Sequence, residues 1–112
     1  MDKNIPLSTL IEIGCRKTIP AKGSYLTMID LQTLSGDTVL EACALGAAAV
    51  AKTGQLTDNI DVGQAIGHLL QVEVKHPAEN IKENVKCVVV SLNDEHEWPR
   101  EHIAYWLKTI GL

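Results

Sequence analysis

The chain has 112 residues, of which 46% are hydrophobic, and a formal net charge of −4. This length predicts one domain over residues 1–112, large enough to bury a core without disulfides or metals. The mildly acidic charge excludes the positive field that general nucleic-acid binding requires. The longest apolar run, residues 42–51, is too short to cross a bilayer, so we expect a cytoplasmic protein without a membrane partner.

The core has to be aliphatic, because the chain contains no Phe, two Trp and two Tyr. Small aliphatic side chains suit closely packed helices. We therefore expect an all-α fold, a compact bundle of about five short helices, with room for one short β-hairpin near residues 24–34. The three cysteines lack C-x-x-C spacing and are expected to be reduced thiols. No cofactor is expected.

Apolar residues recur at helical spacing near the N-terminus and predict a first helix over residues 6–17, with Pro6 in its first turn. Pro20 and Gly23 end this element. The residues that follow favour β-structure and alternate in polarity, which is the basis for the hairpin near residues 24–34. An isolated hairpin is weak, so it would have to lie on the helices.

Thr38 and Glu41 have the spacing of a capping box, in which two side chains bond backbone N–H groups at the start of a helix. They predict a second helix that continues to about Thr53 and ends at Gly54 in the left-handed conformation. Gly46, inside this helix, favours the close approach of a neighbouring element.

Helix-starting residues and apolar stripes predict three further helices, over residues 61–70, 80–92 and 99–111. The valine-rich run at 86–91 also fits a buried strand, so both structures remain open for it. Asn93 is expected to adopt the left-handed conformation that ends the fourth helix.

Three segments resemble a family of small uncharacterised bacterial and phage-associated proteins. They are Leu7-Ser8, Cys43-Ala-Leu-Gly-Ala-Ala48, and the stretch from Leu92 to Trp106, which contains Leu-Asn-Asp-x-His-x-Trp followed by x-Arg-Glu-x-Ile-Ala-x-Trp. The resemblance implies no particular activity. Some members carry Cys-Pro-x-Cys before the fourth helix. This chain has His76-Pro-Ala-Glu79 there, which puts a shared metal site in doubt.

The loop before the last helix contains the richest set of ionisable groups, and these are the candidate catalytic residues Asp94, His96 and Glu97. A histidine between carboxylates is suited to acid–base chemistry near neutral pH, as in a small hydrolase-like enzyme. In the structural alternative, Asp94 caps backbone N–H groups and Trp98 packs the loop onto the core. We favour the structural alternative, because no substrate-binding group is evident nearby.

Other candidate sites have simple structural explanations. No pair of histidines has the i, i+4 spacing of a helical metal site, so no metal is expected. Cys43 lies more than one turn inside the expected helix, which favours a buried, unreactive thiol over a nucleophile. Arg16, Lys17 and Lys22 form a basic cluster that could bind an anion or nucleic acid, or could simply complement a helix end.

Trp98 and Tyr105 are candidate contact residues for a protein partner, since aromatic side chains are enriched at interfaces. The leading hypothesis is a non-enzymatic protein–protein interaction or regulatory module. Its expected partner is another protein or a second copy of the chain in a homo-oligomer. The alternatives are the hydrolase-like enzyme and the anion- or nucleic-acid-binding protein.

Overall fold

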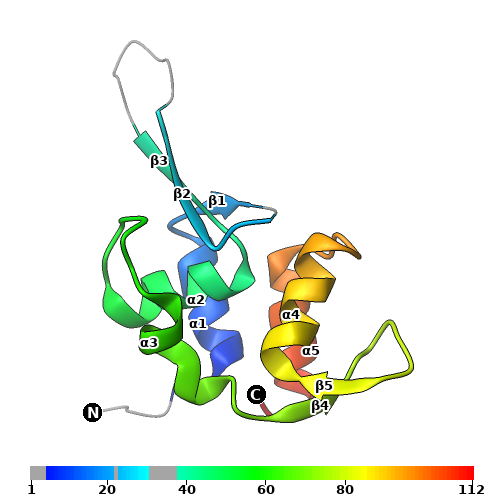
Figure 1. Ribbon diagram of the computed structural model, residues 1–112. Helices are drawn as coiled ribbons and strands as arrows, with labels where there is room; N and C mark the ends of the chain where they lie inside the picture. The colour runs from blue at the N-terminus through cyan, green and yellow to red at the C-terminus, as the bar shows by residue number, and fades with distance from the viewer. Residues whose placement is uncertain (1–4, 22, 31–37) are drawn as a thin grey trace.

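The computed structural model describes residues 5–21, 23–30 and 38–112, and in them the fold is mixed α/β, which corrects the expected all-α bundle (Figure 1). The elements in chain order are α1 (Leu7–Cys15), β1 (Ile19–Pro20), β2 (Leu26–Asp30), β3 (Thr38–Ala42), α2 (Ala44–Thr53), α3 (Val62–Ile66), the 3-10 turn η1 (Gly67–Leu69), β4 (Glu73–Lys75), β5 (Lys82–Asn84), α4 (Val85–Asp94) and α5 (Arg100–Thr109). None of the described helices has the length and apolar character needed to span a membrane.

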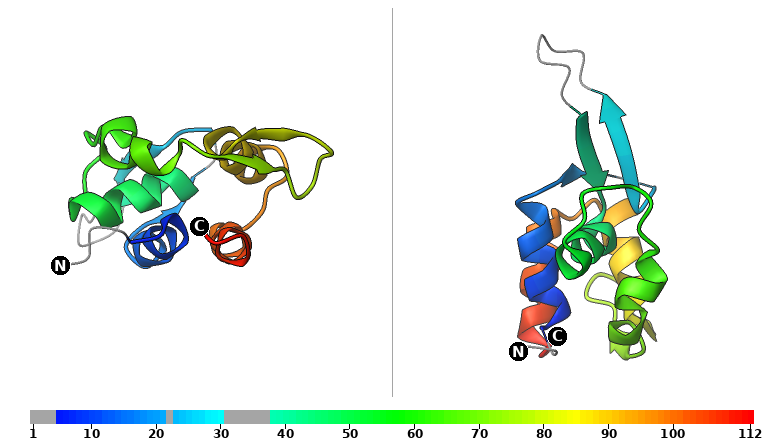
Figure 2. Two further views of the ribbon diagram at one scale, coloured as in Figure 1. Left: turned by 90° about the horizontal axis from the view of Figure 1, so that it is seen from below. Right: turned by 90° about the vertical axis from the view of Figure 1, so that its left-hand side faces the viewer.

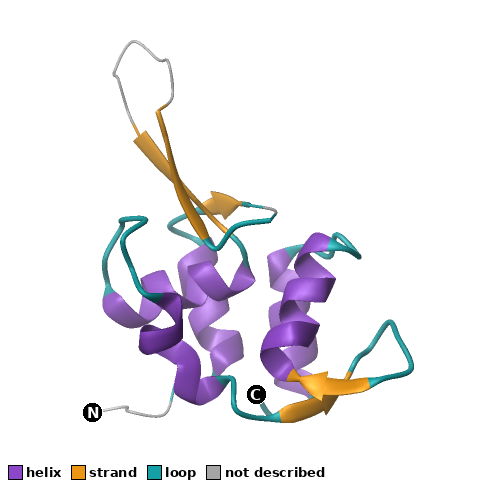
Figure 3. Ribbon diagram, viewed as in Figure 1, coloured by secondary structure: helices purple, strands orange, loops and turns teal. Residues whose placement is uncertain are grey.

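The helices form two layers, with α1 and α5 side by side in one and α2, α3 and α4 in the other (Figure 2). One small sheet has the strand order β1-β3-β2, and its β2–β3 hairpin projects away from the helices (Figure 3). The other is the two-stranded β4–β5 ribbon, which leads directly into α4. Side chains from all five helices contribute to one hydrophobic core.

The predicted helix over residues 38–53 differs most from the structure. Its first part is the central strand β3. Thr38–Ala42 pairs antiparallel with β2 and parallel with β1, so its backbone is paired on both sides. This long-range pairing outweighs the local capping-box pattern, which cannot reveal a distant partner strand. The helix begins only at Ala44, and Cys43 is its N-cap. Of the hairpin expected near residues 24–34, the structure has the strand β2, whose antiparallel partner β3 lies beyond that range.

Helices α3 and α5 begin close to their expected positions, whereas α4 begins only at Val85, because residues 82–84 form β5. Asp61, the first residue of the range predicted as helix over 61–70, caps α3 through a bond from the Gln64 N–H group to Oδ1. Residues 86–91, for which both a helix and a buried strand were open, lie inside the helix α4. Asn93 is also inside α4, so its expected left-handed conformation is wrong. The left-handed residue is instead Glu97, with a φ of 55°.

Helix α2 lies at the centre of the core, and two glycines allow other backbones to reach it. All residues from Ala44 to Val50 are buried. A Cβ atom on Gly14 would lie 1.8 Å from the carbonyl oxygen of Ala47, and one on Gly46 would lie 1.9 Å from that of Tyr25. The Tyr25 carbonyl accepts a hydrogen bond from the Cys43 N–H group at 3.2 Å. The expected close approach at Gly46 is therefore confirmed, and it fixes the start of the β2–β3 hairpin on α2.

We predict that Gly14→Ala and Gly46→Ala each lower the free energy of unfolding by at least about 2 kcal/mol, because the added methyl group meets backbone that cannot move aside. This loss exceeds the gain of roughly 1 kcal/mol in helix propensity. Gly63→Ala is the matched control, since its Cβ would make an ordinary contact of 3.5 Å with Asp61. Urea denaturation should show the control unchanged or slightly stabilised. Equal effects in all three variants would contradict the close-approach explanation.

Arg100, the first residue of α5, joins that helix to the small sheet through a buried guanidinium group. It donates from Nη1 to the hydroxyl of Thr18 at 2.7 Å and to the carbonyl of Ala42 at 3.1 Å, and from Nη2 to the carbonyl of Thr18 at 3.0 Å. The side chain is 4% exposed, and no ion pair among the described residues includes it. Neutral oxygens of Thr18, just before β1, and of Ala42, at the end of β3, therefore solvate the two Nη atoms of a buried positive charge, while Nε has no partner among the described residues.

Replacing this side chain should be costly. We expect Arg100→Ala to lower the free energy of unfolding by about 2–4 kcal/mol, because it leaves buried oxygens without their donors. Lys108→Ala, on the same helix, removes only an exposed ion pair with Glu12 and should cost less than about 1 kcal/mol. Thermal and urea denaturation of both variants would measure the difference, and similar losses would show that Arg100 has no special role.

Candidate functional site: a groove along α4 with an acidic end

Three adjoining hollows, of about 250, 480 and 490 Å³, run along the exposed side of α4. They are contiguous because they share lining residues, and all three include Tyr25. We name this feature the α4 groove and define it by the shared residues Tyr25, Leu45, Lys86, Cys87, Val90 and Asp94. Tyr25 and Leu45 come from the side of α2, and the other four come from α4.

The groove has apolar walls and an acidic end. Leu45 and Val90 line the part beside the C-terminal end of α4. Val62 and Leu70 line the part beside α3 and η1. The hollow next to the β4–β5 ribbon is bordered by one lysine, Lys86, and by four carboxylates, those of Glu79, Glu83, Asp94 and Glu95. Such a surface can bury apolar groups and attract positive charge at one end.

Asn93 and Asp94, the last two residues of α4, hold the groove in shape at the C-terminal end of this helix. The amide oxygen of the buried Asn93 accepts from the N–H group of Ala44, the first residue of α2, at 3.2 Å. Its amide nitrogen donates to the carbonyl of Ala21 at 3.0 Å and to Asp94 at 2.7 Å. Asp94 in turn accepts the Gly23 N–H group at 3.1 Å. Asp94 thus bonds a backbone N–H, as the structural alternative expected, but one 71 residues away.

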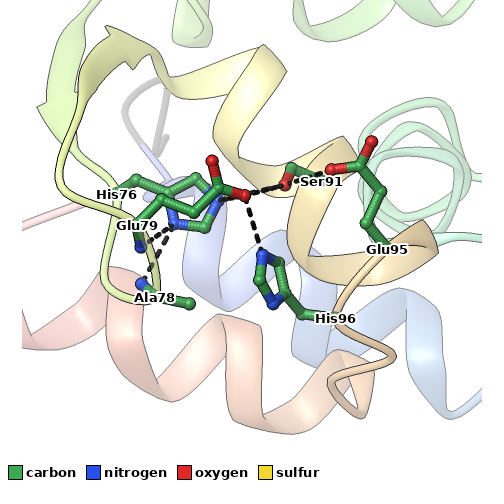
Figure 4. Close-up of polar contacts among 6 residues, drawn as sticks. All are labelled: His76, Ala78, Glu79, Ser91, Glu95 and His96. Carbon is green, nitrogen blue, oxygen red and sulfur yellow. Dashed lines mark hydrogen bonds and ion pairs between the residues drawn. The ribbon is translucent and has the colours of Figure 1, made fainter.

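At the acidic end, four polar side chains form a cluster of His76, Glu79, Ser91 and His96 (Figure 4). Nε2 of His96 lies 2.8 Å from Oε2 of Glu79, and Nε2 of His76 lies 3.0 Å from the Ser91 hydroxyl. Ser91 also donates to Glu95 at 3.0 Å or to Glu79 at 3.4 Å. The hydrogen bond from His96 is the main reason that the pKa of the Glu79 carboxyl lies below its usual value.

The ring of His76 has only one tautomer that fits its surroundings. Its Nδ1 atom accepts hydrogen bonds from the N–H groups of Ala78 and Glu79, at 3.0 and 3.1 Å, so the proton of the neutral ring is on Nε2. His76 is 1% exposed and therefore held firmly in this orientation. A ring with this proton donates to Ser91 and cannot accept its proton, as the base of a serine nucleophile would have to do.

The same tautomer bears on metal binding. Ligand atoms of His76, Glu79 and His96 lie within 4.8 Å of one another, a spacing that a metal ion could bridge. However, a metal-bound histidine donates from its other ring nitrogen, whereas Nδ1 of His76 faces two donors. Coordination through Nε2 would require a fully deprotonated ring. The cluster is therefore better described as a hydrogen-bond network than as a metal centre.

The structure pairs His96 with Glu79, 17 residues earlier, while the carboxylate of Asp94 is directed to Gly23. Trp98 is partly buried against the core, as expected, and stacks on His102 with ring centroids 4.5 Å apart. Tyr105 is 65% exposed on α5 and does not line the α4 groove. The predicted catalytic set and the predicted contact residues are therefore not gathered in one place.

The predicted basic cluster is described only in part. Arg16 and Lys17 are exposed just after α1, and Lys22 lies outside the described residues. Cys43 is the N-cap of α2, not a residue inside the helix, and its Sγ atom accepts from the Gly46 N–H group. Burial nevertheless raises the pKa of its thiol, so the expectation of a buried, unreactive cysteine agrees with its surroundings.

Sequence reasoning did not connect Glu79, Ser91 and His76 with His96. These residues belong to different elements, and their proximity depends on the fold of the β4–β5 ribbon onto α4. The available signal was His76-Pro-Ala-Glu79 itself, because a side-chain acceptor before proline commonly closes a turn. No protein-family model, curated protein or solved structure matches this chain.

We predict that His76→Ala lowers the free energy of unfolding by about 2 kcal/mol, because two backbone donors lose their acceptor. His76→Asn should retain part of the stability, since an Asn oxygen can close the same turn. Nitrogen-detected NMR of the wild-type imidazole at neutral pH should show the proton on Nε2. A protonated Nδ1 would contradict the assigned tautomer and would reopen the metal-binding alternative.

Proposed function

We propose that this protein is a non-enzymatic binding module that holds a segment of a partner protein in the α4 groove. The segment presents apolar side chains to the groove walls and lysine or arginine to the acidic end. The observation that supports this most directly is the combination of an apolar lining beside α4 with four carboxylates, from the β4–β5 ribbon and the C-terminal end of α4, at one end of the groove. The face of α4 that lines the groove contains the exposed side chain of Cys87 and the partly exposed one of Val90.

An extended partner suits this geometry better than a small molecule does. The three hollows adjoin one another along the helix, so a chain segment can place successive side chains in them. Charge complementarity favours a cationic segment, because carboxylates predominate at the acidic end and the chain has a net charge of −4. The three cysteines are free thiols, which is the state expected in a reducing cytoplasm.

The geometry favours neither of the two alternative functions. The hydrolase-like enzyme would need a base near a nucleophile, and His76 has its proton on the nitrogen that faces Ser91. Anion binding would rest on Arg16 and Lys17, which lie at exposed positions outside the groove. Self-association remains one way of filling the groove, and light scattering would distinguish a second copy from a different partner.

We predict that a display library of random peptides yields binders enriched in apolar residues and in lysine or arginine. Cys87→Arg should weaken their binding by at least about tenfold, because it places a large cation in the groove. This one substitution reduces the free volume of the groove and its negative charge. Because Cys87 is exposed, the core is not disturbed. Fluorescence anisotropy with a labelled peptide would measure the dissociation constant.

The matched control is Tyr105→Arg, which introduces the same side chain at an exposed position outside the groove. It should leave the dissociation constant unchanged within about twofold. The proposal is wrong if the library gives no binder, or if the two arginine variants bind the selected peptides equally well.

A further inference from the structure

We infer that a cationic side chain of the partner binds Glu79 by displacing His96, so that partner binding releases a proton and becomes tighter as the pH rises. The inference rests on the proposed function, because it identifies where the α4 groove receives the partner's charge and what occupies that position beforehand. It follows from the geometry of the cluster at the acidic end.

The pair of Glu79 and His96 is accessible from solvent. Nε2 of His96 and Oε2 of Glu79 are 2.8 Å apart, yet the two side chains remain 31% and 38% exposed. Glu79 also lines the acidic end of the groove, whereas His96 belongs to the loop that follows α4. An incoming ammonium or guanidinium group can therefore reach the carboxylate that His96 now contacts.

Glu79 is held in place without help from His96. The loop that carries it is closed by hydrogen bonds from the Ala78 and Glu79 N–H groups to the buried ring of His76. A backbone bond from the His76 N–H group to the Ile81 carbonyl, at 2.9 Å, closes the same loop. The Ser91 hydroxyl, 3.4 Å from Oε2 of Glu79, and Nε2 of His76, 3.6 Å from the same oxygen, also stay in place, so departure of His96 leaves the carboxylate there for the partner's cation. His76 is a positioning residue, and His96 is the exchangeable one.

The charged groups around His96 determine the sign of the pH dependence. Glu79 faces it from the β4–β5 loop, the ring of His76 lies 5.3 Å away, and Glu95, the residue after α4, is linked to the network through Ser91. On α5, His102 stacks on Trp98. Protonated His96 forms a charge-assisted bond that offsets the charge of Glu79, whereas neutral His96 forms a weaker one. The partner's cation thus meets its strongest competitor at low pH.

By linkage, a competitor that binds better in its protonated form favours the release of that proton when the partner displaces it. The probe is a selected peptide that contains lysine or arginine and no histidine. Between about pH 5.5 and pH 7.5, the range in which imidazoles titrate, its affinity for the wild-type protein should rise about two- to fivefold, which is the size of one exposed ion pair. Calorimetry in buffers of different ionisation enthalpy should detect the released proton.

Two variants test the roles of the pair. His96→Gln should bind tightly at both pH values, because the competing cation is gone. Glu79→Gln should bind about two- to fivefold more weakly than wild type at the higher pH and should also lose the pH dependence. His102→Gln is the control histidine and should keep the wild-type profile. NMR of the wild-type protein should show the His96 ring signals change when the peptide saturates the groove.

The inference is overturned if His96→Gln retains the pH dependence, or if Glu79→Gln binds the peptide as wild type does. Peptides whose binding is blocked by Cys87→Arg but does not vary with pH would support the groove and refute the exchange at Glu79. A library without binders would remove the proposed function and this inference together.

Discussion

The arrangement of the whole domain depends on how closely other backbones approach α2. Gly14 brings α1 onto α2 at Ala47, and Gly46 brings the Tyr25 carbonyl onto the start of the same helix. Both contacts are possible only because a side chain is missing at the point of closest approach. The second contact also sets the position of Tyr25, which lines every part of the α4 groove. A packing constraint inside the core therefore determines the shape of a surface feature.

The helices could be predicted from the sequence because their apolar stripes and end residues are local signals. Asp61 and Pro99 lie where the structure begins α3 and α5. Strand β3 could not be predicted, because Thr38 and Glu41 satisfy a helix-start pattern, while the strand depends on partners in β1 and β2. Strand β5, Lys82–Asn84, likewise lies within the helix predicted over residues 80–92. Where pairing is non-local, the pattern of one segment does not decide its structure.

The candidate site shows the same division. His96 was predicted as a candidate residue together with Asp94 and Glu97, its neighbours in the sequence. The structure supplies Glu79, which reaches His96 because a buried histidine closes the loop between β4 and β5. Asn93 was predicted to end the fourth helix. Its side chain instead joins α4 to the first N–H group of α2. Long-range hydrogen bonds of this kind leave no periodic trace in a sequence.

The cysteines of the chain differ sharply in chemical accessibility. Burial raises the pKa of the Cys15 thiol to about 11 and also raises that of Cys43, so both stay protonated at neutral pH. Cys87 is the exposed one, and its side chain lines the groove. A maleimide or a photoactivatable thiol reagent should therefore modify the natural protein selectively at Cys87. The molecule thus provides its own attachment point for a reporter or cross-linker beside whatever occupies that surface, with no engineered residue.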